Sequence, residues 1–145
     1  MDIKLSIVEK ISELIESGVT DFMLIPEHGF TLWVAEIIIG LRDIRIQQGL
    51  SAARLHIVIP YEEHGSELDD NTHKKLYNVY DKSDAVLTLY RRWHDKCHEN
   101  CERFIIDKSD LLFTDDETYF AGQYAELHKK PIVVCKTTQH KKSPC

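Results

Sequence analysis

Two arginines and two aromatic side chains stand side by side in the segment Tyr90-Arg91-Arg92-Trp93, directly after an apolar run. Guanidinium groups bind phosphate oxygens through paired N–H donors, and aromatic faces stack on flat rings. The segment therefore predicts a place for a phosphorylated aromatic compound. The alternative interpretation is a surface turn in which Trp93 packs against the body of the protein.

Polar residues also follow Pro26, where Glu27, His28, Gly29 and Thr31 lie within one short segment. Gly29 would let a ligand approach the backbone, and His28 would donate a hydrogen bond to an anion. Thr31 would either cap a helix or bind a phosphate oxygen. The alternative is an ordinary turn between a strand and a helix.

The segment that begins at Pro60 and Tyr61 is rich in hydrogen-bonding groups, and its carboxylates, Glu63 among them, would accept bonds from ribose hydroxyls. It is equally a solvated turn. Asp115 follows a later apolar run in the same way. The candidate ligand-binding residues are therefore Glu27, His28, Gly29, Thr31, Trp33, Pro60, Tyr61, Glu63, Tyr90, Arg91, Arg92, Trp93 and Asp115.

Thiol and imidazole groups recur after the segment Tyr90–Trp93. Cys97, His98 and Cys101 follow His94 at spacings of three, four and seven residues. On a helix these four residues would share a face, and such ligands can hold zinc. The paired-knuckle spacing of zinc sites is absent, and small thiols commonly pack in cores. We therefore assign no metal and no cofactor, and keep the cluster as an alternative.

The elements that must position these residues follow from hydrophobic periodicity. Helices are predicted from Ile3, from Phe30, and over Asn71–Lys82, Asp95–Lys108 and Tyr119–Lys130; strands are predicted over Phe22–Ile25, Leu55–Ile59, Ala85–Leu89, Leu111–Phe113 and Ile132–Cys135. Alternating strands and helices predict an α/β, Rossmann-like three-layer domain with a mostly parallel sheet of about five strands. In such a sheet, ligands bind beyond the carboxyl ends of the strands, where the candidate residues stand.

Composition limits the class of protein. The chain has 145 residues, of which 43% are hydrophobic, and this predicts a single domain over residues 1–136 followed by a polar tail over 137–145. With a net charge of −6 we expect neither a nucleic-acid partner nor attraction to an acidic membrane. The longest apolar run, 31–41, contains Glu36 and is shorter than the roughly 20 residues of a membrane span. Without a signal-peptide pattern, we expect a cytoplasmic protein with reduced cysteines.

About two thirds of the chain, from Gly18 to Asp116, resembles the YpsA-like branch of the SLOG superfamily. The matching phrases are Gly29-Phe30, Trp33-Val34-Ala35-Glu36, Ile59-Pro60-Tyr61-Glu62, Gly65-Ser66 and Ile106-Asp107-Lys108-Ser109-Asp110. The superfamily includes Lonely Guy phosphoribohydrolases and DNA-processing A proteins. The resemblance implies a Rossmann-like fold and recognition of nucleotides or nucleotide-derived signals, such as the cyclic ADP-ribose-like messengers of bacterial immunity.

The sequence departs from the family pattern at several positions. Ile25-Pro26 replaces a glycine pair, Thr31 replaces an acidic residue, and Cys101-Glu102 replaces an arginine-asparagine pair. A glycine-rich turn is missing after Asp115-Asp116. The family also opens with a strand, whereas this sequence opens with a predicted helix. Either the chain is shortened or the sheet has lost a member, and the edge so exposed favours a homo-oligomer, a dimer or larger.

Three functions are compatible with this sequence. The favoured one is non-catalytic binding of a nucleotide-derived small molecule, in one version a phage anti-defence sponge that sequesters a cyclic nucleotide or ADP-ribose-type immune signal. A nucleoside-monophosphate N-glycosidase of the phosphoribohydrolase type is the second, with Glu36, Glu63 or Asp115 as the carboxylate. A protein-interaction module is the third, and its mark would be a strand-end crevice filled by the protein's own side chains.

Overall fold

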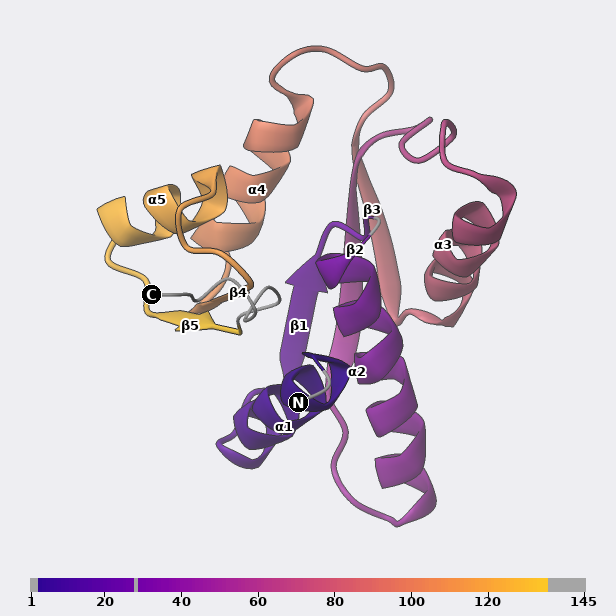
Figure 1. Ribbon diagram of the computed structural model, residues 1–145, viewed down its shortest axis with the longest axis vertical. Helices are drawn as coiled ribbons and strands as arrows, with labels where there is room; N and C mark the ends of the chain where they lie inside the picture. Colours follow the sequence, from indigo (N-terminus) through magenta and orange to yellow (C-terminus); the bar gives the residue numbers. More distant parts are fainter. Residues whose placement is uncertain (1–2, 28, 136–145) are drawn as a thin grey trace, which may run out of the picture.

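The structure is a computed structural model that describes residues 3–27 and 29–135. In these residues five α-helices alternate with five β-strands (Figure 1). The order is α1 (Ile3–Glu16), β1 (Asp21–Leu24), α2 (Phe30–Gln47), β2 (Arg54–Tyr61), α3 (Asp70–Lys82), β3 (Ala85–Tyr90), α4 (Cys97–Asp107), β4 (Leu112–Thr114), α5 (Phe120–Leu127) and β5 (Ile132–Val134). Every predicted element is present, while the predicted tail lies outside the described residues.

The strands form two parallel sheets. β2 lies between β1 and β3 in a three-stranded sheet, and β4 pairs with β5 in a two-stranded one. The prediction of an α/β fold with parallel strands is confirmed, but the five strands do not form one continuous sheet. In Figure 1, β4 and β5 lie on the β1 side of the larger sheet, away from β3. From β1 the chain adds β2 and β3 on one side, and it then returns to place β4 and β5 on the other side of β1. The space between β1 and β4 is therefore the topological switch point of this fold.

Alternating residues of β2 define the three layers. Leu55 and Ile57 are buried against α1, α2 and α3 on one face of the sheet. Val58 is buried on the other face, where it packs with Cys101 of α4. Burial of an aliphatic side chain contributes about 1.5–3 kcal/mol. The central strand is thus fixed from both sides, and its carboxyl end has a defined position.

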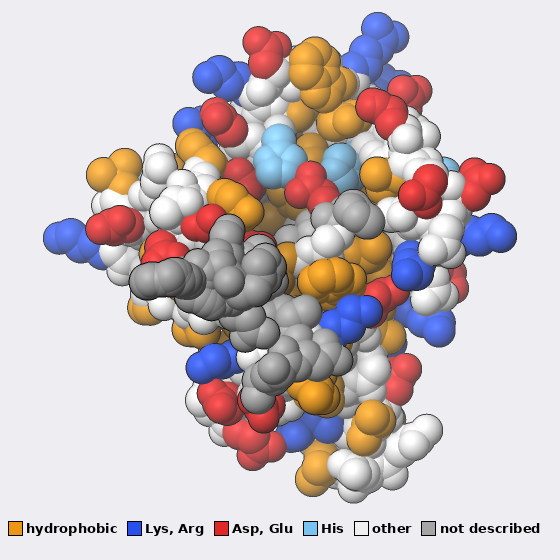
Figure 2. Space-filling view, viewed as in Figure 1, with side chains coloured by type: hydrophobic (Ala, Val, Ile, Leu, Met, Phe, Trp, Pro, Cys, Tyr) orange, Lys and Arg blue, Asp and Glu red, His pale blue; other side chains and the backbone are white. Residues whose placement is uncertain are grey.

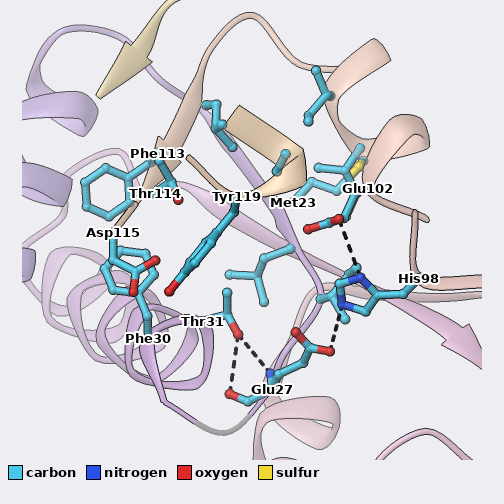
Figure 3. A pocket seen from close by; sticks show the side chains of 16 residues that line it. Met23, Glu27, Phe30, Thr31, His98, Glu102, Phe113, Thr114, Asp115 and Tyr119 are labelled. Atoms are coloured by element: carbon cyan, nitrogen blue, oxygen red, sulfur yellow. Dashed lines mark hydrogen bonds and ion pairs between the residues drawn. The ribbon is translucent and has the colours of Figure 1, made fainter. Parts of the chain in front are cut away.

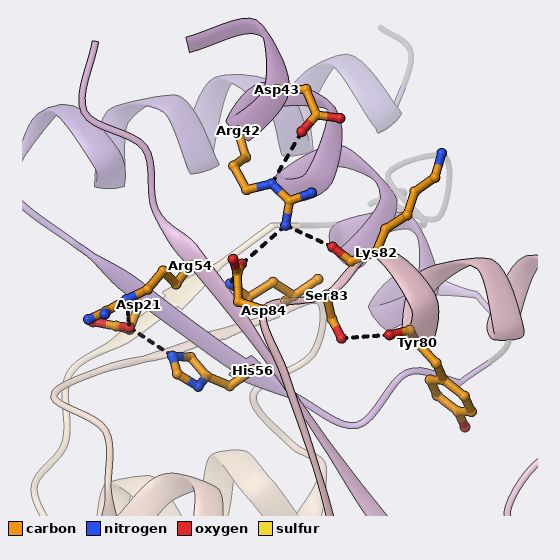
Figure 4. A network of polar contacts seen from close by, with 10 residues as sticks. Asp21, Arg42, Asp43, Arg54, His56, Tyr80, Lys82, Ser83 and Asp84 are labelled. Carbon is orange, nitrogen blue, oxygen red and sulfur yellow. Dashed lines mark hydrogen bonds and ion pairs between the residues drawn. The ribbon is translucent and has the colours of Figure 1, made fainter. Parts of the chain in front are cut away.

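A network of polar contacts holds the opposite, amino-terminal ends of the strands (Figure 4). The Asp84 carboxylate accepts hydrogen bonds from the Leu55 backbone N–H at 2.7 Å and from the Arg42 guanidinium at 3.1 Å. The Asp21 carboxylate faces His56 Nε2 at 2.8 Å, and hydrogen bonding from His56 holds the Asp21 pKa well below its ordinary value. These contacts are structural and leave the carboxyl ends of the strands open.

β3 is an outer strand of its sheet. Its residues Val86 and Leu87 are 47% and 46% exposed. The expected homo-oligomer stays a prediction. Among the described helices, none combines the length and apolar character needed to cross a membrane.

Candidate functional site

A cavity of about 290 Å³ lies at the switch point, between the ends of β1 and β4. We call it the switch-point cavity (Figure 3). Its base is apolar and includes Met23, Leu24, Ile25, Ile105, Ile106, Leu112 and Phe113. Its polar residues are Glu27, Thr31, His98, Glu102, Thr114, Asp115 and Tyr119. The site thus combines an apolar interior with hydrogen-bonding groups, as small-molecule sites commonly do.

The turn from β1 into α2 places Glu27 at this cavity. The Glu27 backbone N–H donates to Thr31 Oγ1 at 2.9 Å, and the Thr31 hydroxyl donates back to the Glu27 carbonyl at 3.3 Å. Gly29 has φ 98° in this turn, a conformation that favours glycine. The predicted capping role of Thr31 is wrong, because the N-cap residue of α2 is Gly29 and this cap has no side-chain hydrogen bond. The Thr31 hydroxyl bonds to the Glu27 backbone and lines the switch-point cavity, and its role toward a phosphate oxygen stays a prediction.

Glu27 is the centre of an ion cluster that joins three segments of the chain. Glu27 Oε2 lies 2.9 Å from His98 Nε2 and 3.3 Å from His64 Nε2, and His98 Nδ1 lies 3.5 Å from Glu102 Oε1. Figure 2 shows histidine beside acidic side chains around a hollow with hydrophobic atoms at its base. The cluster fastens α4 to the end of β1 and to the loop after β2.

These contacts fix the charges of the cluster. Burial by itself would raise the pKa of Glu27, but hydrogen bonds from His64 and His98 outweigh it and lower that pKa to about 2. Hydrogen bonds to Glu102 and Glu27 raise the pKa of His98 to about 10. At neutral pH the site therefore holds an ionised Glu27 and an imidazolium at His98.

His64 contacts one residue that lines this cavity and one that lines a second cavity. Its side chain is 10% exposed, and its Nδ1 is buried without a hydrogen-bond partner among the described residues. Because Nε2 faces a carboxylate, that nitrogen carries the proton and Nδ1 is an acceptor when the ring is neutral. The His64 ring also contacts the Tyr61 ring, edge to face, at 5.7 Å between centroids.

The second cavity, which we call the arginine cavity, encloses about 420 Å³. It is lined by Tyr61 and Glu63 from the loop after β2 and by Arg91, Arg92 and Trp93 from the loop after β3. Trp93 is 65% exposed and does not pack against the body of the protein. Two predicted loops therefore meet around one space, with both guanidinium groups and the indole available to a ligand.

Comparison with known proteins gives the family. The sequence model of YpsA, described as a SLOG family, matches residues 2–135. The chain belongs to this family. UPF0398 proteins are similar to it: one from Halalkalibacterium halodurans is 26% identical over 133 residues, covering 88% of the chain and 68% of the relative. One from Macrococcus caseolyticus is 26% identical over 121 residues, covering 79% of the chain and 62% of the relative. One from Staphylococcus epidermidis is 22% identical over 142 residues, covering 92% of the chain and 73% of the relative. The chain thus spans between 62% and 73% of the length of these relatives.

Two departures of this chain from the SLOG pattern have a structural role in the cluster. Thr31, which stands where the pattern has an acidic residue, fixes the backbone of Glu27. Glu102, part of the Cys101-Glu102 replacement, pairs with His98 four residues before it. Sequence reasoning missed Glu102 and His64 as site residues, although the i,i+4 spacing of His98 and Glu102 on α4 is a signal that could have found the pair.

Other predicted residues of this SLOG domain are absent from the linings of the two cavities. The Tyr90 hydroxyl accepts a hydrogen bond from Asn100 at 3.1 Å, so Tyr90 supports α4. Trp33 packs on the main core with the Lys4 ammonium 5.3 Å from its ring centroid. Pro60 is fully buried in β2. His28 lies outside the described residues.

The described structure does not bring the thiols and histidines of the predicted cluster together. Cys101 is buried between α4 and β2, where burial raises its pKa to about 12, and the Cys97 sulfur accepts a hydrogen bond from the His94 backbone N–H at 3.1 Å. His98 is directed to Glu27 instead (Figure 3). In the part of the chain that the structure describes, no three such side chains are placed to hold a metal ion. Helical spacing suggested a shared face, but packing separates the thiols from the imidazole.

Proposed function

We propose that the protein binds a nucleotide-derived small molecule across the switch-point and arginine cavities and does not cleave it. The observation that carries the proposal is the pairing of two guanidinium groups and an exposed indole with a second, acceptor-rich cavity at the same edge of the sheet. Guanidinium groups suit phosphates, the indole suits a flat ring, and carboxylates suit ribose hydroxyls. Membership of a SLOG family supports a nucleotide-related ligand.

The positions of the carboxylates favour binding over hydrolysis. Asp115 lines the switch-point cavity, whereas Glu63 lines the arginine cavity. Glu36 lies on α2 and lines neither cavity. Glycosidic cleavage needs one carboxylate in reach of the bond that breaks, and Glu36 is therefore the candidate that its position disfavours. Glu27 is engaged by two histidines at one of its oxygens and is oriented as a fixed acceptor.

Open cavities also favour a small molecule over a scaffold role. An interaction module was expected to fill its strand-end crevice with its own side chains, whereas a cavity of about 290 Å³ remains at the switch point. Volumes of roughly 300 Å³ upward are typical of small-molecule sites. Binding without turnover would remove a cyclic nucleotide or ADP-ribose-type signal from solution, so the proposal extends to sequestration of such a signal.

Titration calorimetry and thermal unfolding with a panel of mononucleotides, cyclic dinucleotides and ADP-ribose test the proposal. We expect saturable heat and an increase in Tm with at least one class, because a ligand at a hundred times its Kd stabilises a folded protein by about 2.7 kcal/mol. The double variant R91Q/R92Q should lose this response. The matched control is K74Q/K75Q, which removes the same charge from exposed positions of α3.

Two outcomes would contradict the proposal. If no compound gave a heat of binding or an increase in Tm, the proposal that the protein binds nucleotides would be contradicted. Release of free base from a nucleoside monophosphate, measured by chromatography after incubation, would replace non-catalytic binding by N-glycosidic hydrolysis.

A further inference from the structure

The helical layers that cover β2 do not extend over its neighbour β3. Residues of the two strands pair in a parallel register. Val86 is 47% exposed, but its register partner Ile57, on the face of α2 and α3, is 1% exposed. Leu87 is 46% exposed, but its register partner Val58, on the face of α4, is 1% exposed. Strands of parallel sheets are normally buried on both faces, so β3 has apolar surface that its own chain leaves uncovered on each face.

The outer edge of β3 is also suited to pairing with a further strand. In the described part of the chain β3 pairs with β2 alone, so its other edge presents backbone N–H and C=O groups without strand partners. Natural proteins commonly protect such an edge with charged residues or proline. The six residues of β3, AVLTLY, include neither. The strand thus combines an open edge with exposed apolar side chains.

We propose that two copies of the chain form a homodimer in which their β3 strands pair antiparallel about a two-fold axis. An axis perpendicular to the sheet keeps each face of the sheet continuous across the two copies. With Thr88 on the axis, Leu87 of one copy stands opposite Leu89 of the other. In the same register Val86 stands opposite Tyr90. Apolar side chains of both faces are therefore buried together, which matches the exposure of β3 on both faces.

Charge complementarity selects a second copy as the partner and the antiparallel direction as its orientation. β3 follows Asp81 and Asp84 and precedes Arg91 and Arg92, and all four residues are exposed. In the register described above, Arg92 of each copy stands opposite Asp84 of the other, as opposite charges in cross-strand pairs do. Asp84 accepts a hydrogen bond from Arg42, but its side chain is 31% exposed and therefore open to a second guanidinium. Parallel pairing would instead bring the arginines of both copies together.

Substitutions at Thr88 test both the dimer and its register. Sedimentation of the wild type should give a dimer with a Kd of about 1–100 µM, because one pair of short strands makes a small interface. T88K and T88E should each raise this Kd at least about tenfold, because two like charges would stand opposite each other on the axis. An equimolar mixture of the two variants should restore dimerisation through a Lys–Glu pair. The control Q47K, at an exposed position of α2, should leave the Kd unchanged.

Three sedimentation results would overturn the inference. They are a wild type that stays monomeric at millimolar concentration, a T88K or T88E variant that dimerises as tightly as wild type, and a mixture that dimerises no better than the single variants. If the charged variants do not fold, hydrogen exchange of the wild type decides. Dilution below the Kd should speed exchange of the β3 amides and not of the β2 amides, and exchange of β3 that is independent of concentration would exclude the dimer. These experiments contain no nucleotide, so their failure leaves the proposed function standing.

Discussion

The substitution H98Q tests whether the ion cluster holds α4 against the end of β1. His98 makes two charge-assisted contacts, to Glu27 at 2.9 Å and to Glu102 at 3.5 Å. Its side chain is 44% exposed, so solvent screens both, and each contributes about 0.5–1 kcal/mol. We expect H98Q to lower the free energy of unfolding by about 1–2 kcal/mol at pH 6, which corresponds to a fall in Tm of about 2–8 °C for a domain of this size.

The pH dependence gives this prediction its sign. The pKa of His98 is raised from 6.5 to about 10 on folding, so its contribution is complete below pH 6.5 and is lost as the pH rises toward 10. The pKa of Glu27 is lowered from 4.5 to about 2, so the contribution of Glu27 is also lost as the pH falls through that window. The difference between wild type and H98Q should therefore be largest between these windows.

Urea unfolding of wild type and variant at a series of pH values measures this difference. The control is H73Q, at a helical histidine whose ring contacts Tyr77 rather than a carboxylate. A difference that stays constant from pH 6 to pH 10, or that H73Q reproduces, would show that His98 acts by packing and not by charge.

Further predictions concern positions away from the cluster. A Cβ at Gly122 would lie 2.0 Å from the Glu117 carbonyl oxygen, so G122A should lose about 1–3 kcal/mol in urea unfolding. A Cβ at Gly40, within α2, meets nothing within 4 Å, so G40A should instead raise the free energy of unfolding by about 0.5–1 kcal/mol. If both variants lost the same amount of stability, the steric argument would be contradicted. Folding lowers the pKa of Asp21 through its hydrogen bond to His56, so wild type should lose stability relative to D21N as the pH falls below 3.8, and parallel acid denaturation curves would disprove this.

Much of the fold could be predicted because each element has a strong local signal. The apolar run Leu55–Ile59 ends at Pro60, and it lies within β2, which is buried between two helical layers. The predicted convergence of the strand-end loops also follows from topology. Parallel neighbours end at the same edge, so Tyr61 and Arg91 line one cavity although 30 residues separate them.

The rest depended on contacts that no local pattern encodes. His98 Nε2 reaches Glu27 across 71 positions of sequence, and the rotation of α4 about its axis decides whether His98 or Cys101 meets the cavity. Spacing alone placed both on one face. The core resolves the choice, because Val58 and Ile25 accept the small thiol and leave the imidazole at the polar edge. The split of the sheet could not be predicted either. It arises because β1 and β4 do not pair, whereas a local pattern reports only the propensity within each strand.

That split and the ion cluster together account for the cavity. Strands paired in a sheet lie about 4.8 Å apart, which would leave no space for a ligand between β1 and β4. The described strands pair only outward, β1 with β2 and β4 with β5, and the ladders on this side are short, with three residues in each of β4 and β5. Residues of α4 line the cavity, and the contact of His98 with Glu27 attaches this helix to the end of β1. The charges that stabilise the cluster are therefore also charges that line the cavity, because Glu27, His98 and Glu102 do both.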